Sequence, residues 1–132
     1  MNPFPIPIHG AWRLVSFEII NPQGESQPWG DNMHGTLLYT PDGWMSASIN
    51  RAIDPPGSEN PEAVLDSCLF YSGRYELTEN ELRHFVSEAS DPHRIAKTLI
   101  RYPQWDGTTL KLSSPPQPWG TAVIGWRKAD SK

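Results

Sequence analysis

The sequence GTLLYTPDGWMSASIN, residues 35–50, contains two β-strand candidates on either side of a tight turn. The strand candidates are residues 35–40 and 43–50, and the turn is TPDG at residues 40–43. An Asp-Gly pair suits the positive φ values that a short hairpin connection requires. This stretch therefore predicts an antiparallel hairpin whose register is set by its turn.

Further short segments with the composition of strands lie on both sides of this hairpin. The chain holds 14 prolines and 10 glycines, which interrupt the sequence at short intervals and mark turns. The further candidates are residues 11–20, 72–78, 81–89, 95–102, 108–113 and 119–128. Eight sequential strands joined by short turns suit a meander that closes on itself, because closure removes exposed strand edges. We therefore predict an all-β fold, an eight-stranded antiparallel up-and-down barrel with one short helix.

The helix is predicted after the third strand candidate. The sequence NPE at residues 60–62 supplies an N-cap asparagine, a proline at the first helical position and an acid in the first turn. Apolar side chains then repeat at helical spacing from Leu65 to about residue 71. Cys68 falls on this apolar stripe, where we expect it to pack rather than to react. The polar residues 51–60 before the helix are a candidate for a mobile lid.

Strict alternation divides the long strand candidate 11–20 into two faces. One face carries Trp12, Leu14, Ser16 and Glu18, and the other carries Arg13, Val15, Phe17 and Ile19. Neither face is purely polar. We therefore expect this strand to be covered on both sides for part of its length.

Length and composition fit one domain in a reducing compartment. A chain of 132 residues is the size of a single domain, so we expect one barrel over residues 10–132. Residues 1–9 contain three prolines, which predicts an extended N-terminal arm. Cys68 is the one cysteine, so no intramolecular disulfide can form. We expect a cytoplasmic protein, because residues 1–10 also lack the basic and apolar regions of a signal peptide.

Composition also argues against several classes of partner. The formal net charge is −4, and the basic residues are scattered rather than clustered, so nucleic acid is not an expected partner. No stretch of about 18 apolar residues could cross a membrane as a helix. The four histidines lack the spacing of metal ligands, and no glycine-rich phosphate loop occurs, so we expect neither a metal nor a cofactor.

Polar side chains within the strand candidates are the best candidates for a functional site. They are Glu18, Tyr39, Tyr75, His84 and Arg101. Alternation places His84 on the same face as Leu82 and Val86, so an inward His84 would be a polar group in an apolar interior that needs a partner. Arg101 could form a buried pair with Glu18. The alternatives are a satisfied internal network or outward exposure.

Tryptophans are the other candidates for lining a cavity. Trp44, with Trp29, Trp105 and Trp119, could form aromatic walls of a small-molecule site or of its mouth. Plain packing in the core is an equal alternative for each of them.

Together, several of these segments resemble a known family. Residues 10–18 match the pattern G-x-W-x-L-V-S-F-E, residues 28–30 are P-W-G, and residues 35–46 match G-x-L-x-Y-T-P-D-G-x-M-S. The hairpin from residue 73 through His84 and the closing Trp126-Arg127 also match. Over about residues 10–128 the chain resembles the lipocalin-like domain proteins of bacteria and fungi.

The resemblance implies a lipocalin-like barrel with an apolar small-molecule pocket. It also implies that Arg127 packs over Trp12, as the equivalent arginine does in lipocalins. It implies no particular reaction, although some members of the family occur among biosynthetic enzymes of secondary metabolism. Fold alone does not decide function.

Three functions follow from these observations. The first is a binding protein whose cavity encloses one small, mostly apolar molecule, positioned by one or two of the polar residues. The second is a cofactor-independent enzyme, such as an isomerase or cyclase, in which His84 acts as acid or base together with a tyrosine or an arginine. The third is an interaction module whose barrel is filled by side chains, since an eight-stranded barrel can be either filled or hollow.

Overall fold

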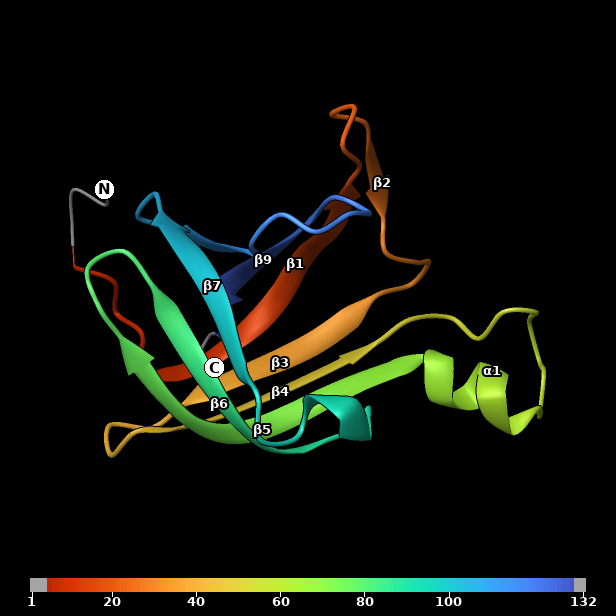
Figure 1. Ribbon diagram of the computed structural model, residues 1–132, viewed down its shortest axis with the longest axis horizontal. Coiled ribbons are helices and arrows are strands. Elements are labelled where there is room, and N and C mark those ends of the chain that lie inside the picture. Colours follow the sequence, from red (N-terminus) through yellow and green to blue (C-terminus); the bar gives the residue numbers. More distant parts are fainter. Residues whose placement is uncertain (1–4, 130–132) are drawn as a thin grey trace.

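Pairing between the first long strand and the last closes the sheet into a barrel (Figure 1). The computed structural model describes residues 5–129. The elements are β1 (Gly10–Ile20), β2 (Ser26–Pro28), β3 (His34–Tyr39), β4 (Trp44–Asn50), α1 (Pro61–Asp66), β5 (Cys68–Leu77), β6 (Leu82–Ala89), η1 (Pro92–Arg94), β7 (Thr98–Trp105), β8 (Thr109–Ser113) and β9 (Thr121–Lys128). All pairings are antiparallel between neighbours in the order β1-β3-β4-β5-β6-β7-β8-β9, and β9 pairs back with β1. The predicted eight-stranded barrel is therefore confirmed.

Strand β2 lies outside the closed barrel. It pairs only with the end of β1, opposite residues 18–20. The hairpin at residues 35–50 forms as predicted, with Tyr39 opposite Met45 and Gly43 at a φ of 99° in the turn.

The helix is shorter than its sequence pattern predicts. Asn60 caps α1 by accepting a hydrogen bond from the backbone N–H of Glu62, but α1 ends at Asp66. The prediction of a helix to about residue 71 is wrong, because the chain from Cys68 onward pairs with β4. In this pairing Tyr71 lies opposite Ala47, so Tyr71 belongs to the inward face of a strand.

Strand β7 also differs from its prediction at both ends. The predicted strand covered residues 95–102, whereas β7 runs from Thr98 to Trp105 after the short helix η1. Pro103 does not end the strand but stands opposite Leu112 of β8. The first half of β7 pairs with β6 and the second half pairs with β8.

A β-bulge in β1 changes which residues face the interior. The register with β9 skips Val15, so that Leu14 pairs with Trp126 and Ser16 pairs with Gly125. An extra residue reverses the alternation beyond it. Trp12 and Phe17 are therefore both buried inside, although strict alternation places them on opposite faces.

One end of the barrel is filled by side chains. Trp12, Leu82 and Leu110 are completely buried there, and the indole N–H of Trp12 donates to the carbonyl oxygen of Ile8, 2.9 Å away. Ile8 is itself buried, so the described part of the N-terminal arm contributes to the core. Residues 1–4 of that arm lie outside the described residues.

The cation over Trp12 is Lys128 rather than Arg127. The ammonium of Lys128 lies 4.9 Å from the centre of the indole ring. Arg127 stands opposite Arg13 in the ladder, is exposed, and contacts Thr109 through its Nε at 3.5 Å. The contact that the family resemblance implied for Arg127 is thus wrong, because neighbouring residues of a strand point to opposite faces.

Gly73 permits the close approach of β6 to β5. The register between these strands shifts at Ser72/Gly73, and a Cβ on Gly73 would overlap the backbone carbonyl oxygen of Phe85. This approach holds β6 against β5 directly beside His84, which precedes Phe85 in the chain.

We predict that Gly73→Ala lowers the free energy of unfolding by about 2 kcal/mol or more, because overpacking against backbone is not relieved by a side-chain rotation. Urea unfolding of the wild type and the variant measures the change. The matched control is Ser72→Ala on the neighbouring residue, where we expect a change within about 0.5 kcal/mol. Equal stability of Gly73→Ala and the wild type would contradict this packing.

Candidate functional site

The end of the barrel opposite Trp12 contains a cavity of about 580 Å³. Most of its wall is apolar and comes from strands on several sides of the barrel, including Phe17, Leu37, Ile49, Leu69 and Ile124. A cavity of this volume lies within the range of sites for small molecules, about 300–1,000 Å³. The interior is therefore divided into a filled end and a hollow end.

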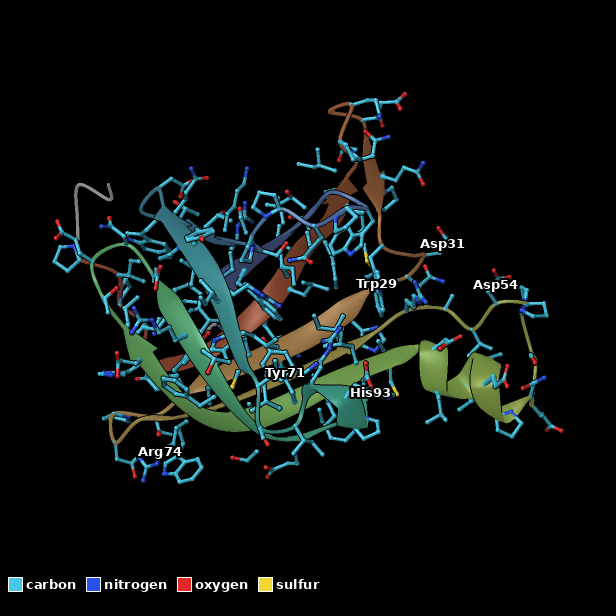
Figure 2. All side chains as sticks on the ribbon, in the orientation of Figure 1. Trp29, Asp31, Asp54, Tyr71, Arg74 and His93 are labelled. Atoms are coloured by element: carbon cyan, nitrogen blue, oxygen red, sulfur yellow. The ribbon has the colours of Figure 1, made fainter. Side chains whose placement is uncertain are left out.

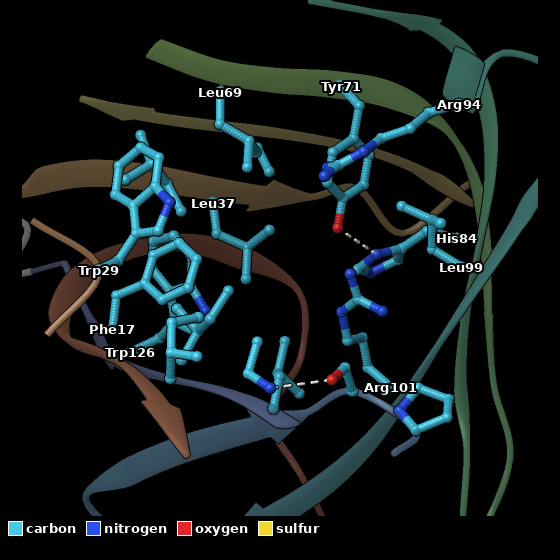
Figure 3. Close-up of a pocket in the computed structure, with 18 of the residues that line it drawn as sticks. Phe17, Trp29, Leu37, Leu69, Tyr71, His84, Arg94, Leu99, Arg101 and Trp126 are labelled. Atoms are coloured by element: carbon cyan, nitrogen blue, oxygen red, sulfur yellow. Dashed lines mark hydrogen bonds between the residues drawn. The ribbon is translucent and has the colours of Figure 1, made fainter. Parts of the chain in front are cut away.

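Polar side chains gather on one side of this cavity. Figure 3 shows Tyr71, His84 and Arg101 together, across the cavity from Phe17 and Trp29. They come from the neighbouring strands β5, β6 and β7. The asymmetry means that a ligand would meet apolar surface over most of its body and hydrogen-bonding groups on one side.

His84 connects two tyrosines at the floor of the cavity. Its Nε2 lies 2.7 Å from the hydroxyl of Tyr39, and its Nδ1 lies 2.8 Å from the hydroxyl of Tyr71. His84 is 1 % exposed, and both tyrosines are buried. Of the alternatives that the sequence leaves open for His84, the structure has the inward position, and the partners that its burial requires are Tyr39 and Tyr71.

The surroundings of the two tyrosines decide the direction of these hydrogen bonds. Tyr39 is buried and does not line the cavity, so a Tyr39 hydroxyl that accepted from His84 would leave its own proton without an acceptor among residues 5–129. We therefore assign this hydroxyl as the donor to Nε2. A neutral imidazole carries one N–H, which then lies on Nδ1 and donates to the oxygen of Tyr71. The proton of Tyr71 remains available, and Tyr71 lines the cavity. The network therefore presents one O–H donor to the interior.

Burial keeps all three groups uncharged near neutral pH. Desolvation, and to a lesser extent the charge of Arg101, lowers the pKa of His84 from 6.5 to about 3. Desolvation raises the pKa of Tyr71, against smaller lowering effects of Arg101 and Arg94. The pKa of Tyr39 is raised well above its usual value, mainly by burial. His84 is therefore a hydrogen-bonding group rather than an acid or base at pH 7.

Arg101 lines the cavity, but Glu18 does not. One guanidinium nitrogen of Arg101 donates to the carbonyl oxygen of Ile100 at 2.8 Å. Glu18 lies beyond the bulge of β1, where it accepts a long hydrogen bond of 3.4 Å from Ser26. The expected pair between Arg101 and Glu18 does not form, because the bulge turns Glu18 to the face opposite Phe17 and Ile19.

Tyr75 and Trp44 do not line the cavity within the described residues. Tyr75 lies behind Tyr39, with ring centres 4.7 Å apart, and its hydroxyl donates to the carbonyl oxygen of Thr40. Trp44 is on the outer face of β4, 43 % exposed, with the guanidinium of Arg74 4.5 Å from its ring centre. Figure 2 shows Arg74 on the outside of the barrel. The placement of Trp44 at the cavity is corrected, because its neighbour Met45 takes the inward position.

Other tryptophans do reach the cavity or its mouth. Trp29 stacks on Phe17, with ring centres 4.9 Å apart. The guanidinium carbon of Arg51 also lies over the Trp29 ring, 4.0 Å from its centre. Trp119, in the connection between β8 and β9, lines the cavity and is half exposed. Trp105 instead packs against Trp12.

The candidate lid does not cover the cavity. Residues 51–60 and α1 extend to the side of the barrel in Figure 1, and none of these described residues lines the cavity. Residues of the proline-rich connection between β8 and β9, including Pro115 and Gln117, line it instead.

Tyr71 and Arg94 are site residues that the sequence analysis missed. The helical spacing predicts that Tyr71 ends the helix, although Leu69, Tyr71, Gly73 and Tyr75 alternate in the way of a strand. Arg94 falls in a connection before the predicted strand 95–102, where no sequence pattern indicates a direction for its side chain. It lies in η1 and lines the cavity.

Residues 5–129 contain no group of three or more His, Cys, Asp or Glu side chains that could hold a metal ion. No helix among them is long and apolar enough to cross a membrane.

Comparisons with known proteins agree with this architecture. A family model described as a lipocalin-like domain matches residues 9–127. Among solved structures, a redesigned β-barrel is similar, with a TM-score of 0.50, 9 % sequence identity, and coverage of 93 % of this chain and 92 % of that chain. An asparagine-to-alanine mutant of the fluorescent protein UnaG has a TM-score of 0.45, 16 % identity, and coverage of 93 % and 96 %. No curated protein matches the sequence.

The low pKa of His84 predicts a specific pH dependence of stability. Below pH 6.5 the unfolded chain binds a proton at His84, whereas the folded protein does not until about pH 3. Unfolding is therefore favoured as the pH falls through this window, by about 1.4 kcal/mol per pH unit from this group alone.

Urea unfolding between pH 7 and pH 4 tests this dependence against the variant His84→Gln, which has no titratable group at this position. We expect the stability advantage of the wild type to shrink as the pH falls. Parallel pH profiles of the two proteins would show that His84 is not held neutral.

Proposed function

The chain belongs to the lipocalin-like domain family, and from this premise we propose that its barrel binds one small, mostly apolar molecule. The observation that carries the proposal is the cavity of about 580 Å³, apolar over most of its wall and polar on one side. This division matches the general design of small-molecule sites, in which a few polar groups orient an otherwise apolar ligand. The filled-barrel alternative has no support, because it requires that no such cavity exist.

Tyr71 is the proposed polar anchor of the ligand. Its hydroxyl reaches the cavity, and His84 holds its oxygen from the other side. Because the imidazole N–H already occupies that oxygen, the phenolic proton is directed to an acceptor such as a ligand carbonyl oxygen. His84 and Tyr39 thus position the Tyr71 hydroxyl, and Tyr71 and Arg101 are the hydrogen-bond donors of this group that we propose for the ligand.

The catalytic alternative has less support than binding. An isomerase or cyclase that uses His84 as acid or base requires a pKa near the working pH. The pKa of about 3 leaves His84 unprotonated and weakly basic at pH 7. Its two hydrogen bonds to tyrosines also occupy both ring nitrogens, so no nitrogen is left for a substrate.

Binding in the cavity is tested with N-phenyl-1-naphthylamine, an uncharged dye whose fluorescence rises in apolar surroundings. We expect one dye molecule to bind per chain. Ala47→Phe should weaken this binding about tenfold or more, because Ala47 is buried on the cavity wall and a phenyl ring there occupies ligand space.

The matched control places the same ring one residue along β4. Ser48 points to the outer face, so Ser48→Phe should leave dye affinity unchanged. If Ala47→Phe and Ser48→Phe bind the dye as well as the wild type, the dye does not occupy the cavity. No dye binding to the wild type would contradict the proposed function.

The anchoring role of Tyr71 is tested with a ligand that carries a carbonyl group. We expect Tyr71→Phe to weaken the binding of 6-propionyl-2-dimethylaminonaphthalene about fivefold, the usual contribution of one neutral hydrogen bond. Affinity for N-phenyl-1-naphthylamine, which has no carbonyl, should remain the same. Tyr102→Phe on the exposed face of β7 is the control. Equal losses for both dyes would mean that Tyr71 shapes the cavity without anchoring the ligand.

A further inference from the structure

Two arginines enter a cavity whose wall is otherwise mainly apolar. Arg94 comes from η1 and Arg101 from β7, and both line the cavity. In Figure 3, Arg94 reaches toward Tyr71 from one side and Arg101 reaches toward His84 from the other. The hydroxyl of Tyr71 therefore lies beside two positive charges.

Neither arginine has an acidic partner among residues 5–129. The ion pairs in this part of the chain join Arg83 to Glu76 and Glu81, and His93 to Asp91. Arg101 uses one N–H for the carbonyl oxygen of Ile100, and the side chain of Arg94 makes no hydrogen bond within the described residues.

Other arginines of the protein are engaged by the protein itself. Arg51 donates to the carbonyl oxygens of Trp29 and Asp66, and Arg74 lies over the ring of Trp44. Asp91, next to η1, is already bound to the ring and backbone of His93. Arg74 is exposed, so water reaches its remaining donors, whereas Arg94 and Arg101 are half-buried and line the cavity with donor capacity left for a molecule outside the chain.

Half-buried guanidinium groups without a counter-charge lose hydration without compensation. A ligand with negative charge would compensate for this lost hydration. The planar fork of arginine fits the two oxygens of a carboxylate. Tyr71 supplies a third donor at the same place. The apolar wall around Phe17, Leu37 and Ile49 lies across the cavity from these donors.

We propose that the ligand is an amphipathic anion, with its apolar body against the wall and a carboxylate-class group bound by Arg94, Arg101 and Tyr71. This inference rests on the proposed function, because it specifies the ligand of the same cavity. It differs from the sequence-based expectation, which gave the ligand no charge.

The test is displacement of N-phenyl-1-naphthylamine at pH 8 by three molecules with the same ten-carbon chain: decanoate, decan-1-ol and decylamine. We expect decanoate to displace the dye at a concentration about tenfold lower than decan-1-ol, the usual gain from charge-assisted hydrogen bonds. Decylamine, with the opposite charge, should be the weakest competitor.

Variants assign the preference to the two arginines. Arg94→Gln and Arg101→Gln should each reduce the preference for decanoate several-fold, and the double variant should abolish it. Arg101→Lys keeps the charge and should retain part of the preference. Arg74→Gln, which removes a guanidinium from the outer face, should leave it unchanged.

The dye itself separates the possible outcomes. Each variant is first titrated with N-phenyl-1-naphthylamine, and the preference is the ratio of the decanoate and decan-1-ol affinities within that variant. A change of dye affinity on replacing Arg94 or Arg101 therefore does not enter the preference. If the wild type binds the dye but decan-1-ol competes as well as decanoate, or if the preference survives in the double variant, the anionic ligand is wrong and the proposed function stands. If the wild type does not bind the dye, both fail together.

Discussion

A neutral imidazole inside the barrel requires two hydrogen-bond partners, and the arrangement of three strands supplies them. His84 comes from β6, Tyr71 from β5 and Tyr39 from β3, so the network ties β3 to the hairpin of β5 and β6. A buried polar atom left without a partner would cost about 1–3 kcal/mol. The network also marks the boundary inside the barrel, since Tyr39 belongs to the filled end and Tyr71 faces the cavity.

Much of this architecture could be predicted from local sequence patterns. Turn residues such as Asp42-Gly43 predict the hairpin, and alternation groups His84 with Leu82 and Val86, which are buried together with it. These predictions depend only on neighbours in the chain. For this reason the sequence alone predicts the strand count of the closed barrel and the residues that share a face with His84, but not whether that face points inward.

The errors arose where tertiary pairing overrides the local pattern. A bulge at Val15 depends on the register between β1 and β9, and it moved Phe17 into the cavity and Glu18 out of it. Pairing of β5 with β4 extended a strand through residues that repeat at helical spacing, which hid Tyr71. Arg94 could not be found by periodicity at all, because it lies in the single turn of η1.

The distribution of the six tryptophans has an optical consequence. Trp29, Trp119 and Trp126 line the cavity, whereas Trp12, Trp44 and Trp105 lie in the filled end or on the outer face. The first set stands within direct reach of any chromophore in the cavity, and the second set does not contact it. The protein thus combines indoles that a ligand would touch with indoles that it would not, so that occupancy of the cavity can be followed as a change in part of the tryptophan emission without an added label.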